Sequence, residues 1–115
     1  MNSERPLAVV FFRTEAGNEP VREWLKGLSK EDRKIIGEDL LTVQYAWPVG
    51  KPLVDHLAEG IWEVRSRLGR RIARTLFIEA NQELVLLHGF IKKTRKTPKE
   101  DLAVAKKRRK QYLQL

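Results

Sequence analysis

Basic side chains gather in two neighbouring segments of the chain, and both segments have the chemistry needed to hold a phosphate group. The first segment contributes four arginines: Arg65, Arg67, Arg70 and Arg74. The second contributes three lysines and an arginine: Lys92, Lys93, Arg95 and Lys96. Fixed guanidinium and ammonium groups stabilise the negative charge that develops when a phosphodiester is attacked. The two segments are therefore the first candidates for a functional site.

Alternation along two strands predicts that the four arginines share one face of a β-hairpin. A two-residue turn at Leu68-Gly69 would place residue 67 opposite 70, 65 opposite 72 and 63 opposite 74. One face of the hairpin then carries Glu63, Arg65, Arg67, Arg70, Ile72 and Arg74. The other face carries Trp62, Val64, Ala73, Thr75 and Phe77. We expect the first face to be open and cationic and the second to be core.

The same register would place Glu63 directly opposite Arg74. Such a cross-strand pair contributes about 0.2–1 kcal/mol and holds the guanidinium in position. Like charges placed side by side cost stability unless an anion offsets them, which favours a phosphate-binding role for this face. The alternative is that the arginines form an ordinary solvated surface that binds no ligand.

Three further side chains lie near the second basic segment. Phe90 offers a ring on which a nucleic-acid base can stack, although a strand phenylalanine belongs more often to the core. Thr97 stands where a helix begins, and the free amides of a helix N-terminus add donors to an anion site. His88 lies within a strand, and we interpret it as a structural histidine rather than a proton shuttle.

Composition narrows the possible chemistry and partners. The chain has no cysteine and two histidines, and Glu59, Glu83 and Glu100 show no paired arrangement, which predicts a site without metal or cofactor. Lys and Arg outnumber Asp and Glu by 23 to 15, and the net charge of +8 indicates a polyanionic partner. No stretch approaches the roughly 20 apolar residues of a membrane span. The first residues lack a small-residue cleavage site, so we expect a cytoplasmic protein.

The elements that must position these residues follow from periodicity. The apolar run 7–12 predicts a central strand buried on both faces. Two amphipathic helices follow, capped by Asn18 and Ser29, and Pro48 ends the second. An antiparallel meander is expected over 61–67, 70–79 and 83–91. A final helix begins at the capping box 97–100 and runs to about residue 112.

The expected fold is therefore α+β, with one domain over residues 1–115. A small, mostly antiparallel sheet of about four strands carries the helical hairpin on one side, and a C-terminal helix completes the chain.

Two strings of this sequence resemble the phage-derived, HigB-like branch of the RelE/HigB toxin superfamily. The first is Ile61-Trp-Glu-Val-Arg-Ser-Arg-Leu-Gly-Arg-Arg-Ile-Ala-Arg-Thr-Leu-Phe77. The second, Leu86-Leu-His-Gly-Phe-Ile-Lys-Lys-Thr-Arg-Lys-Thr-Pro98, is the more specific of the two. The resemblance covers most of the chain, and the order of the expected elements agrees with that superfamily.

The resemblance implies the toxin of a type II toxin–antitoxin system, a metal-independent endoribonuclease that cleaves mRNA on translating ribosomes. The ribose 2′-OH would attack its own 3′-phosphate and leave a 2′,3′-cyclic phosphate. By this resemblance the catalytic residues are Arg65, Lys92, Lys93 and Lys96. The residues assigned to RNA binding from the sequence itself are Arg67, Arg70, Arg74, Phe90 and Arg95. The implied partner is a HigA-like helix-turn-helix antitoxin in a hetero-oligomer with the toxin.

Two other functions remain open at this point. A ParE-like inhibitor of DNA gyrase uses the same scaffold without RNA chemistry, and a non-catalytic RNA-binding module would use the same cations. The identity of the general base is also open. Parts of the superfamily use a histidine or tyrosine near the carboxyl end, whereas Tyr112 here lies far along the last helix. One possibility is that a lysine, Lys93 or Lys96, is the base. The other is that the site chiefly orients the RNA and stabilises the transition state, while the ribosome supplies the alignment.

Overall fold

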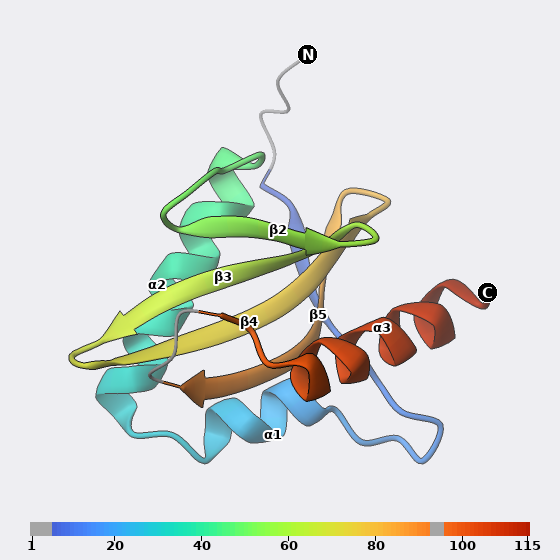
Figure 1. Cartoon of the computed structure of the whole chain (residues 1–115), viewed down its shortest axis with the longest axis horizontal. Coiled ribbons are helices and arrows are strands. Elements are labelled where there is room, and N and C mark those ends of the chain that lie inside the picture. The colour runs from blue at the N-terminus through green and yellow to red at the C-terminus, as the bar shows by residue number, and fades with distance from the viewer. Residues whose placement is uncertain (1–5, 93–95) are drawn as a thin grey trace.

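A mixed five-stranded sheet forms the centre of the molecule (Figure 1). The computed structural model describes residues 6–92 and 96–115. In chain order the elements are β1 (Ala8–Phe11), α1 (Pro20–Lys26), α2 (Lys30–Ala46), β2 (Val54–Ala58), β3 (Ile61–Leu68), β4 (Arg71–Ala80), β5 (Glu83–Lys92) and α3 (Lys99–Leu113). The strand order is β1-β5-β4-β3-β2. The α+β class is confirmed, with five strands where about four were expected.

The antiparallel meander of β3, β4 and β5 is confirmed. The additional strand is β2, which lies in a segment expected to be a loop. It pairs antiparallel with β3. It was missed because the prolines and glycine of 48–52 are typical of a loop, and the strand that follows them has only five residues. None of the helices among the described residues is long and apolar enough to cross a membrane.

The prediction that the first strand is central was wrong. β1 lies at the edge of the sheet and pairs parallel with β5 alone. Its run of apolar residues has a different cause, because both of its faces are covered. Val9 and Phe11 pack against one hydrophobic cluster, and Val10 and Phe12 belong to the other. A strand covered on both faces needs apolar side chains at every position, whether it is central or at an edge.

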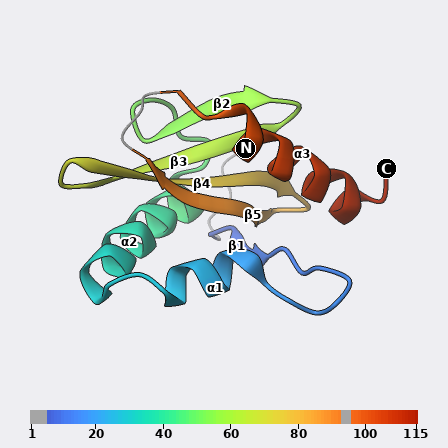
Figure 2. The ribbon, with the colours of Figure 1, turned by 60° about the horizontal axis from the view of Figure 1, so that its bottom comes forward.

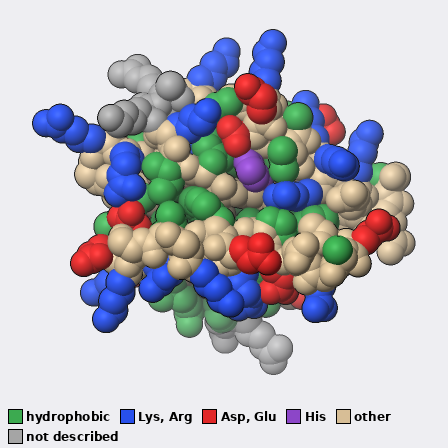
Figure 3. All heavy atoms as spheres, turned by 90° about the horizontal axis from the view of Figure 1, so that it is seen from below, with side chains coloured by type: hydrophobic (Ala, Val, Ile, Leu, Met, Phe, Trp, Pro, Cys, Tyr) green, Lys and Arg blue, Asp and Glu red, His purple; other side chains and the backbone are tan. Residues whose placement is uncertain are grey.

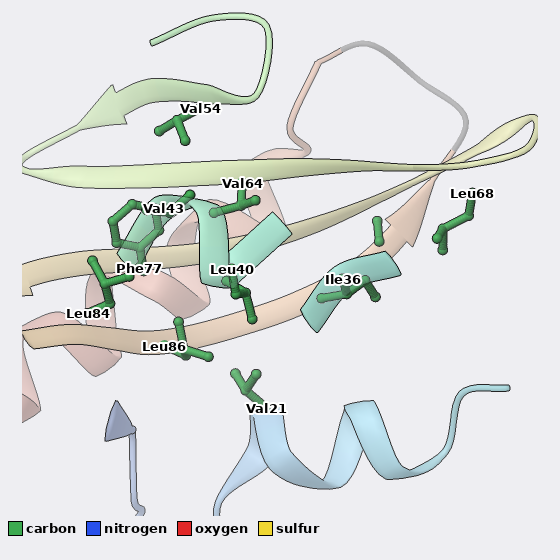
Figure 4. Close-up of a cluster of buried hydrophobic side chains, with 11 residues drawn as sticks. Val21, Ile36, Leu40, Val43, Val54, Val64, Leu68, Phe77, Leu84 and Leu86 are labelled. Carbon is green, nitrogen blue, oxygen red and sulfur yellow. The ribbon is translucent and has the colours of Figure 1, made fainter. Parts of the chain in front are cut away.

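Helices cover both faces of the sheet (Figure 2). The expected helical hairpin, α1 and α2, packs on one face, and α3 packs on the other. The larger hydrophobic cluster lies beneath the hairpin and includes Ile36, Val64 and Phe77 (Figure 4). Trp24 and Trp47 fill the space around this cluster, as expected for core tryptophans.

One of the two predicted helix caps in the hairpin is confirmed and the other is wrong. The Ser29 side chain accepts a hydrogen bond of 3.1 Å from the backbone N–H of Asp32, as expected for an N-cap. The N-cap of α1 is Glu19 and not Asn18. Asn18 belongs to the preceding loop, where its backbone N–H donates to Thr14 Oγ1 and its carbonyl accepts from the Thr14 N–H.

The register of the β3–β4 hairpin differs from the predicted one. Leu68 pairs with Arg71, so the two turn residues are Gly69 and Arg70. Gly69 has a φ of +66°, and a glycine with positive φ suits the first position of a two-residue hairpin loop. Each pair therefore shifts by two residues on β4, and Arg65 pairs with Arg74. Because the shift is even, every side chain except that of the turn residue Arg70 keeps its predicted face.

The packing of the helical hairpin leaves no room for a side chain at Gly89 in β5. A Cβ atom there would lie 2.2 Å from the Trp24 ring, which packs on this position. We expect Gly89→Ala to lower the free energy of unfolding by about 1–3 kcal/mol through overpacking. Urea denaturation of the purified chain measures this change. The matched control is Gly37→Ala on the exposed side of α2, where a Cβ meets nothing within 4 Å and stability should rise by about 0.5–1 kcal/mol. Equal stabilities for the two variants would contradict the packing of Trp24 on β5.

Candidate phosphate-binding site

The candidate site residues lie in three rows that cross the sheet on the α3 face. Register pairs Glu63 with Leu76 and His88 in one row, and Arg65 with Arg74 and Phe90 in the next. The third row consists of Arg67, Ile72 and Lys92. With strands about 4.8 Å apart and rows about 6.8 Å apart, the Cα atoms of Arg65 and Lys92 are separated by roughly 12 Å. Two long side chains can meet across that separation, so Arg65 of β3 and Lys92 of β5 lie within reach of one another.

Glu63 forms the centre of this group although it is only 1% exposed. Its Oε2 atom accepts a hydrogen bond of 3.0 Å from Arg74 Nη1 and lies 3.5 Å from Arg65 Nε. Its Oε1 atom accepts a hydrogen bond of 2.5 Å from the Thr97 hydroxyl. A buried carboxylate requires such partners, because its charge has lost its hydration. One carboxylate thus connects β3, β4 and the segment that leads into α3.

Arg74 was assigned to RNA binding, and that assignment was wrong. Its side chain is 0% exposed and forms an ion pair with Glu63 inside the protein. This face is covered where Leu76 and Phe90 of the sheet join Ala105 of α3 in the smaller hydrophobic cluster, and where Thr97, just before α3, bonds Glu63. The face predicted to be open and cationic is therefore covered over most of its area. Only the part near the β3–β4 turn remains accessible.

The β3–β4 turn and the end of β5 lie at the same end of the sheet (Figure 1), and the accessible cations belong to this end. The Arg65 side chain is 25% exposed, and Arg67, Lys92 and Lys96 are exposed. Arg70 is exposed in the turn itself. Its neighbour Arg71 belongs to the opposite face, where Nη2 donates to Asp32 Oδ2 at 3.0 Å. Four of the predicted cations thus share this region with Arg65 at its centre. Lys93 and Arg95 lie outside the described residues.

Phe90, proposed as a stacking platform for a base, belongs to the core. It is 9% exposed in the smaller cluster, and its ring stacks on His88 with ring centroids 5.5 Å apart. A base therefore has no open ring face to stack on, and this assignment is corrected. The alternative interpretation of a core phenylalanine was the right one.

His88 has a structural partner, as expected. Its Nε2 atom lies 2.7 Å from Asp101 Oδ1 in the first turn of α3, and both side chains are largely buried. This hydrogen bond fastens the start of α3 to β5. Seen from below, the molecule shows lysines and arginines over much of the surface, with fewer acidic side chains among them (Figure 3).

The predicted capping box at the start of α3 was wrong. The N-cap is Pro98, and it makes no side-chain cap. The Thr97 hydroxyl donates instead to Glu63, 34 residues away in the sequence. The threonine-proline-lysine-glutamate pattern is typical of a local cap and carried no signal of this long-range contact. Sequence reasoning placed Thr97 beside the anion site but missed its bond to Glu63, and it also missed the contact of Glu63 with Arg65.

Tyr112 is remote from these residues. Its hydroxyl lies 3.5 Å from Glu83 at the beginning of β5, whereas Lys92 ends the same strand. Nine residues of strand span roughly 30 Å. Burial, followed by the neighbouring Glu83 carboxylate, raises the pKa of Tyr112. Distance and a raised pKa both make this hydroxyl unsuited to serve as a base at the cationic end of the sheet.

Arg108 is a basic residue of α3 with a structural role. Its Nη1 atom donates to the Leu87 carbonyl at 2.8 Å, and burial lowers its pKa. The run of basic residues 106–110 is therefore not a uniform solvated surface. Within residues 6–92 and 96–115, no three His, Asp or Glu side chains gather in a way that could hold a metal ion.

Comparison with known proteins identifies the family of the chain. A search against curated proteins finds no match. Residues 23–110 match the family described as phage derived protein Gp49-like (DUF891), and this range contains every candidate site residue described above. The family is associated with RelE/HigB-like toxins. Because the match covers well over half of its length, the chain belongs to the Gp49-like family of phage-derived proteins.

Proposed function

We propose that this chain is the toxin of a type II toxin–antitoxin system and acts as a metal-independent endoribonuclease on mRNA. One observation carries the proposal. A partly exposed guanidinium, Arg65, is held by a buried carboxylate at the end of the sheet where Lys92 and Lys96 are exposed. The association of the family with RelE/HigB-like toxins supports the same function.

The proposed reaction is an internal transfer of the phosphate. The ribose 2′-oxygen forms a bond to the adjacent phosphorus while the bond from phosphorus to the 5′-oxygen breaks. The products are a 2′,3′-cyclic phosphate and a free 5′-hydroxyl. The proton lost by the 2′-OH goes to a base, and the leaving 5′-oxygen gains a proton from an acid.

Each cation has a task in this reaction. Arg65 stabilises the charge on the non-bridging oxygens, because a guanidinium donates two parallel hydrogen bonds to phosphate. Lys92, Lys93 and Lys96 neutralise the scissile phosphate, and Lys93 or Lys96 serves in proton transfer. Arg67, Arg70 and Arg95 contact the RNA backbone on either side, while Arg74 acts through its ion pair with Glu63 and Phe90 through packing.

The proposed partners follow from this function. The substrate is mRNA on translating ribosomes in the cytoplasm, where the ribosome helps to align the RNA. The inhibitor is a HigA-like helix-turn-helix antitoxin that forms a hetero-oligomer with the toxin.

Induction of the chain in growing cells, followed by primer extension on abundant transcripts, tests the function. We expect growth arrest and discrete new 5′ ends within coding sequences. RNA that stays intact while DNA damage signalling begins would refute the nuclease and favour a ParE-like gyrase inhibitor. RNA that is bound but never cut would favour a non-catalytic binding module.

RNA binding should depend on where an arginine lies rather than on its charge alone. We expect Arg70→Ala to weaken RNA binding about equally for all sequences, because a backbone contact carries no sequence information. The slope of log affinity against log salt should decrease by about 0.7 for a single-stranded RNA. The adjacent Arg71→Ala removes the same charge from the opposite face, where the side chain bonds Asp32. Filter binding at several salt concentrations compares the two, and equal losses would contradict the placement of the site.

A further inference from the structure

We infer that Glu63 is a positioning residue, which aligns Arg65 with Lys96 and uses the Thr97 hydroxyl as the connection. This inference rests on the proposed function and extends it to residues outside the group of cations. Neither Glu63 nor Thr97 contacts the RNA in this arrangement. Each acts by fixing the place of a side chain that does.

The two oxygens of the Glu63 carboxylate hold two different parts of the site. Oε2 lies 3.5 Å from Arg65 Nε and accepts from Arg74 Nη1 at 3.0 Å. Oε1 accepts from the Thr97 hydroxyl at 2.5 Å. The carboxylate plane is fixed from the inside by Arg74, which is 0% exposed. A rigid carboxylate thus sets both the direction of the Arg65 guanidinium and the place of Thr97.

Thr97 directly follows the second basic segment, and its bond to Glu63 holds the chain at that point. Lys96 directly precedes it, and α3 begins two residues later at Lys99. Thr97 bonds the same carboxylate that contacts Arg65, so Lys96 lies next to a fixed point of the site. Release of the Thr97 hydroxyl would let Lys96 move relative to Arg65. A misplacement of about 1 Å can cost about 100-fold in rate, because catalysis depends on the geometry of the reacting groups.

Stability alone gives a weaker explanation of this carboxylate. A buried ion pair is often no more stabilising than apolar residues of similar volume, so a core built for stability alone would not require one. The same carboxylate also contacts Arg65, which is 25% exposed, and the partly buried Thr97 hydroxyl, so it joins the interior to side chains nearer the surface. A positioning role accounts for both features.

Thr97→Val tests the inference because it removes only the hydroxyl. Cleavage of mRNA on translating ribosomes should show kcat reduced about 10- to 100-fold with KM within about twofold of the original. Thr97→Ser keeps the hydroxyl and should restore most of kcat. Thr75→Val makes the same change at a buried threonine on the face beneath α1 and α2, and it should cleave at the original rate. Circular dichroism and thermal melts confirm that all three variants fold.

Glu63→Gln provides the second variant, since it keeps the shape of the side chain and loses its charge. We expect a similar loss of kcat. In the free protein the NMR signal of the Arg65 Nε–Hε group should shift and exchange faster with water in both Glu63→Gln and Thr97→Val, but not in Thr75→Val.

Three outcomes are decisive. Full kcat in both Thr97→Val and Glu63→Gln overturns the inference. A loss of kcat that Thr97→Ser does not restore also overturns it, because the hydroxyl is then not the connection. If the original chain cuts no RNA while the Arg65 signal responds as expected, the proposed function fails and the positioning role falls with it, although the contact itself stands.

Discussion

Arg65→Ala should lower the rate of RNA cleavage by about 100- to 1,000-fold and relieve growth arrest. This is the usual effect of removing one fixed donor from a developing oxyanion. The fold should persist, since the side chain is 25% exposed and its partner Glu63 keeps Arg74 and Thr97. Single-turnover cleavage on programmed ribosomes measures the rate, and a thermal melt checks the fold.

The control for this prediction keeps the charge and changes its geometry. Arg65→Lys replaces a planar fork with a point charge, so the rate should fall between those of the alanine variant and the original chain. Arg71→Ala should cleave normally, because that side chain bonds Asp32 on the opposite face. Toxicity of Arg65→Ala equal to that of the original chain would remove Arg65 from the site, and the same result for Lys93→Ala would remove Lys93.

Arg74→Met should lower the free energy of unfolding by about 3–5 kcal/mol, because it leaves the Glu63 charge buried without its innermost partner. Arg74 is 0% exposed and donates to Glu63 at 3.0 Å. A loss of this size is a large part of the roughly 5–15 kcal/mol that stabilises a typical domain. Urea denaturation followed by tryptophan fluorescence measures the change.

The double variant Glu63→Leu/Arg74→Met separates the charge from the packing. Removing both partners should recover most of the lost stability, since apolar side chains of similar volume often replace a buried ion pair without cost. The double variant should nevertheless cleave RNA slowly, because Arg65 has lost the carboxylate that positions it. As a surface control, Lys51→Ala breaks an exposed ion pair with Asp55 and should change stability by less than about 1 kcal/mol. A loss below 1 kcal/mol for Arg74→Met would show that Glu63 does not depend on this arginine.

Sequence periodicity was reliable for elements whose pattern is local. The helical hairpin, the Ser29 cap and the three-stranded meander follow from spacing alone and are present in the structure. The two faces of the hairpin were also predicted correctly although its turn was misplaced by one residue. Moving the turn by one residue shifts the partner strand by two, and an even shift leaves each strand residue on its own face.

Tertiary packing determined which cations of the face are accessible. The sequence predicts that Arg65, Arg67 and Arg74 share a face, but it does not indicate that Arg74 is fully buried while Arg65 is 25% exposed. Burial depends on which element packs across the sheet, and the sequence of the 15-residue helix α3 does not indicate where on the sheet the helix packs. The same reason explains Phe90, which the helix encloses in the smaller cluster.

The sequence by itself determined the residue types, the period of each element and the excess of positive charge, because these depend on neighbours along the chain. Only the tertiary structure decided that β1 is an edge strand, that Gly89 lies against Trp24 and that Thr97 bonds Glu63. Those contacts join residues far apart in the chain, and their energies come from packing and from the desolvation of a buried charge. The candidate site depends on both, since the sequence supplies its cations and the fold brings them to one end of the sheet.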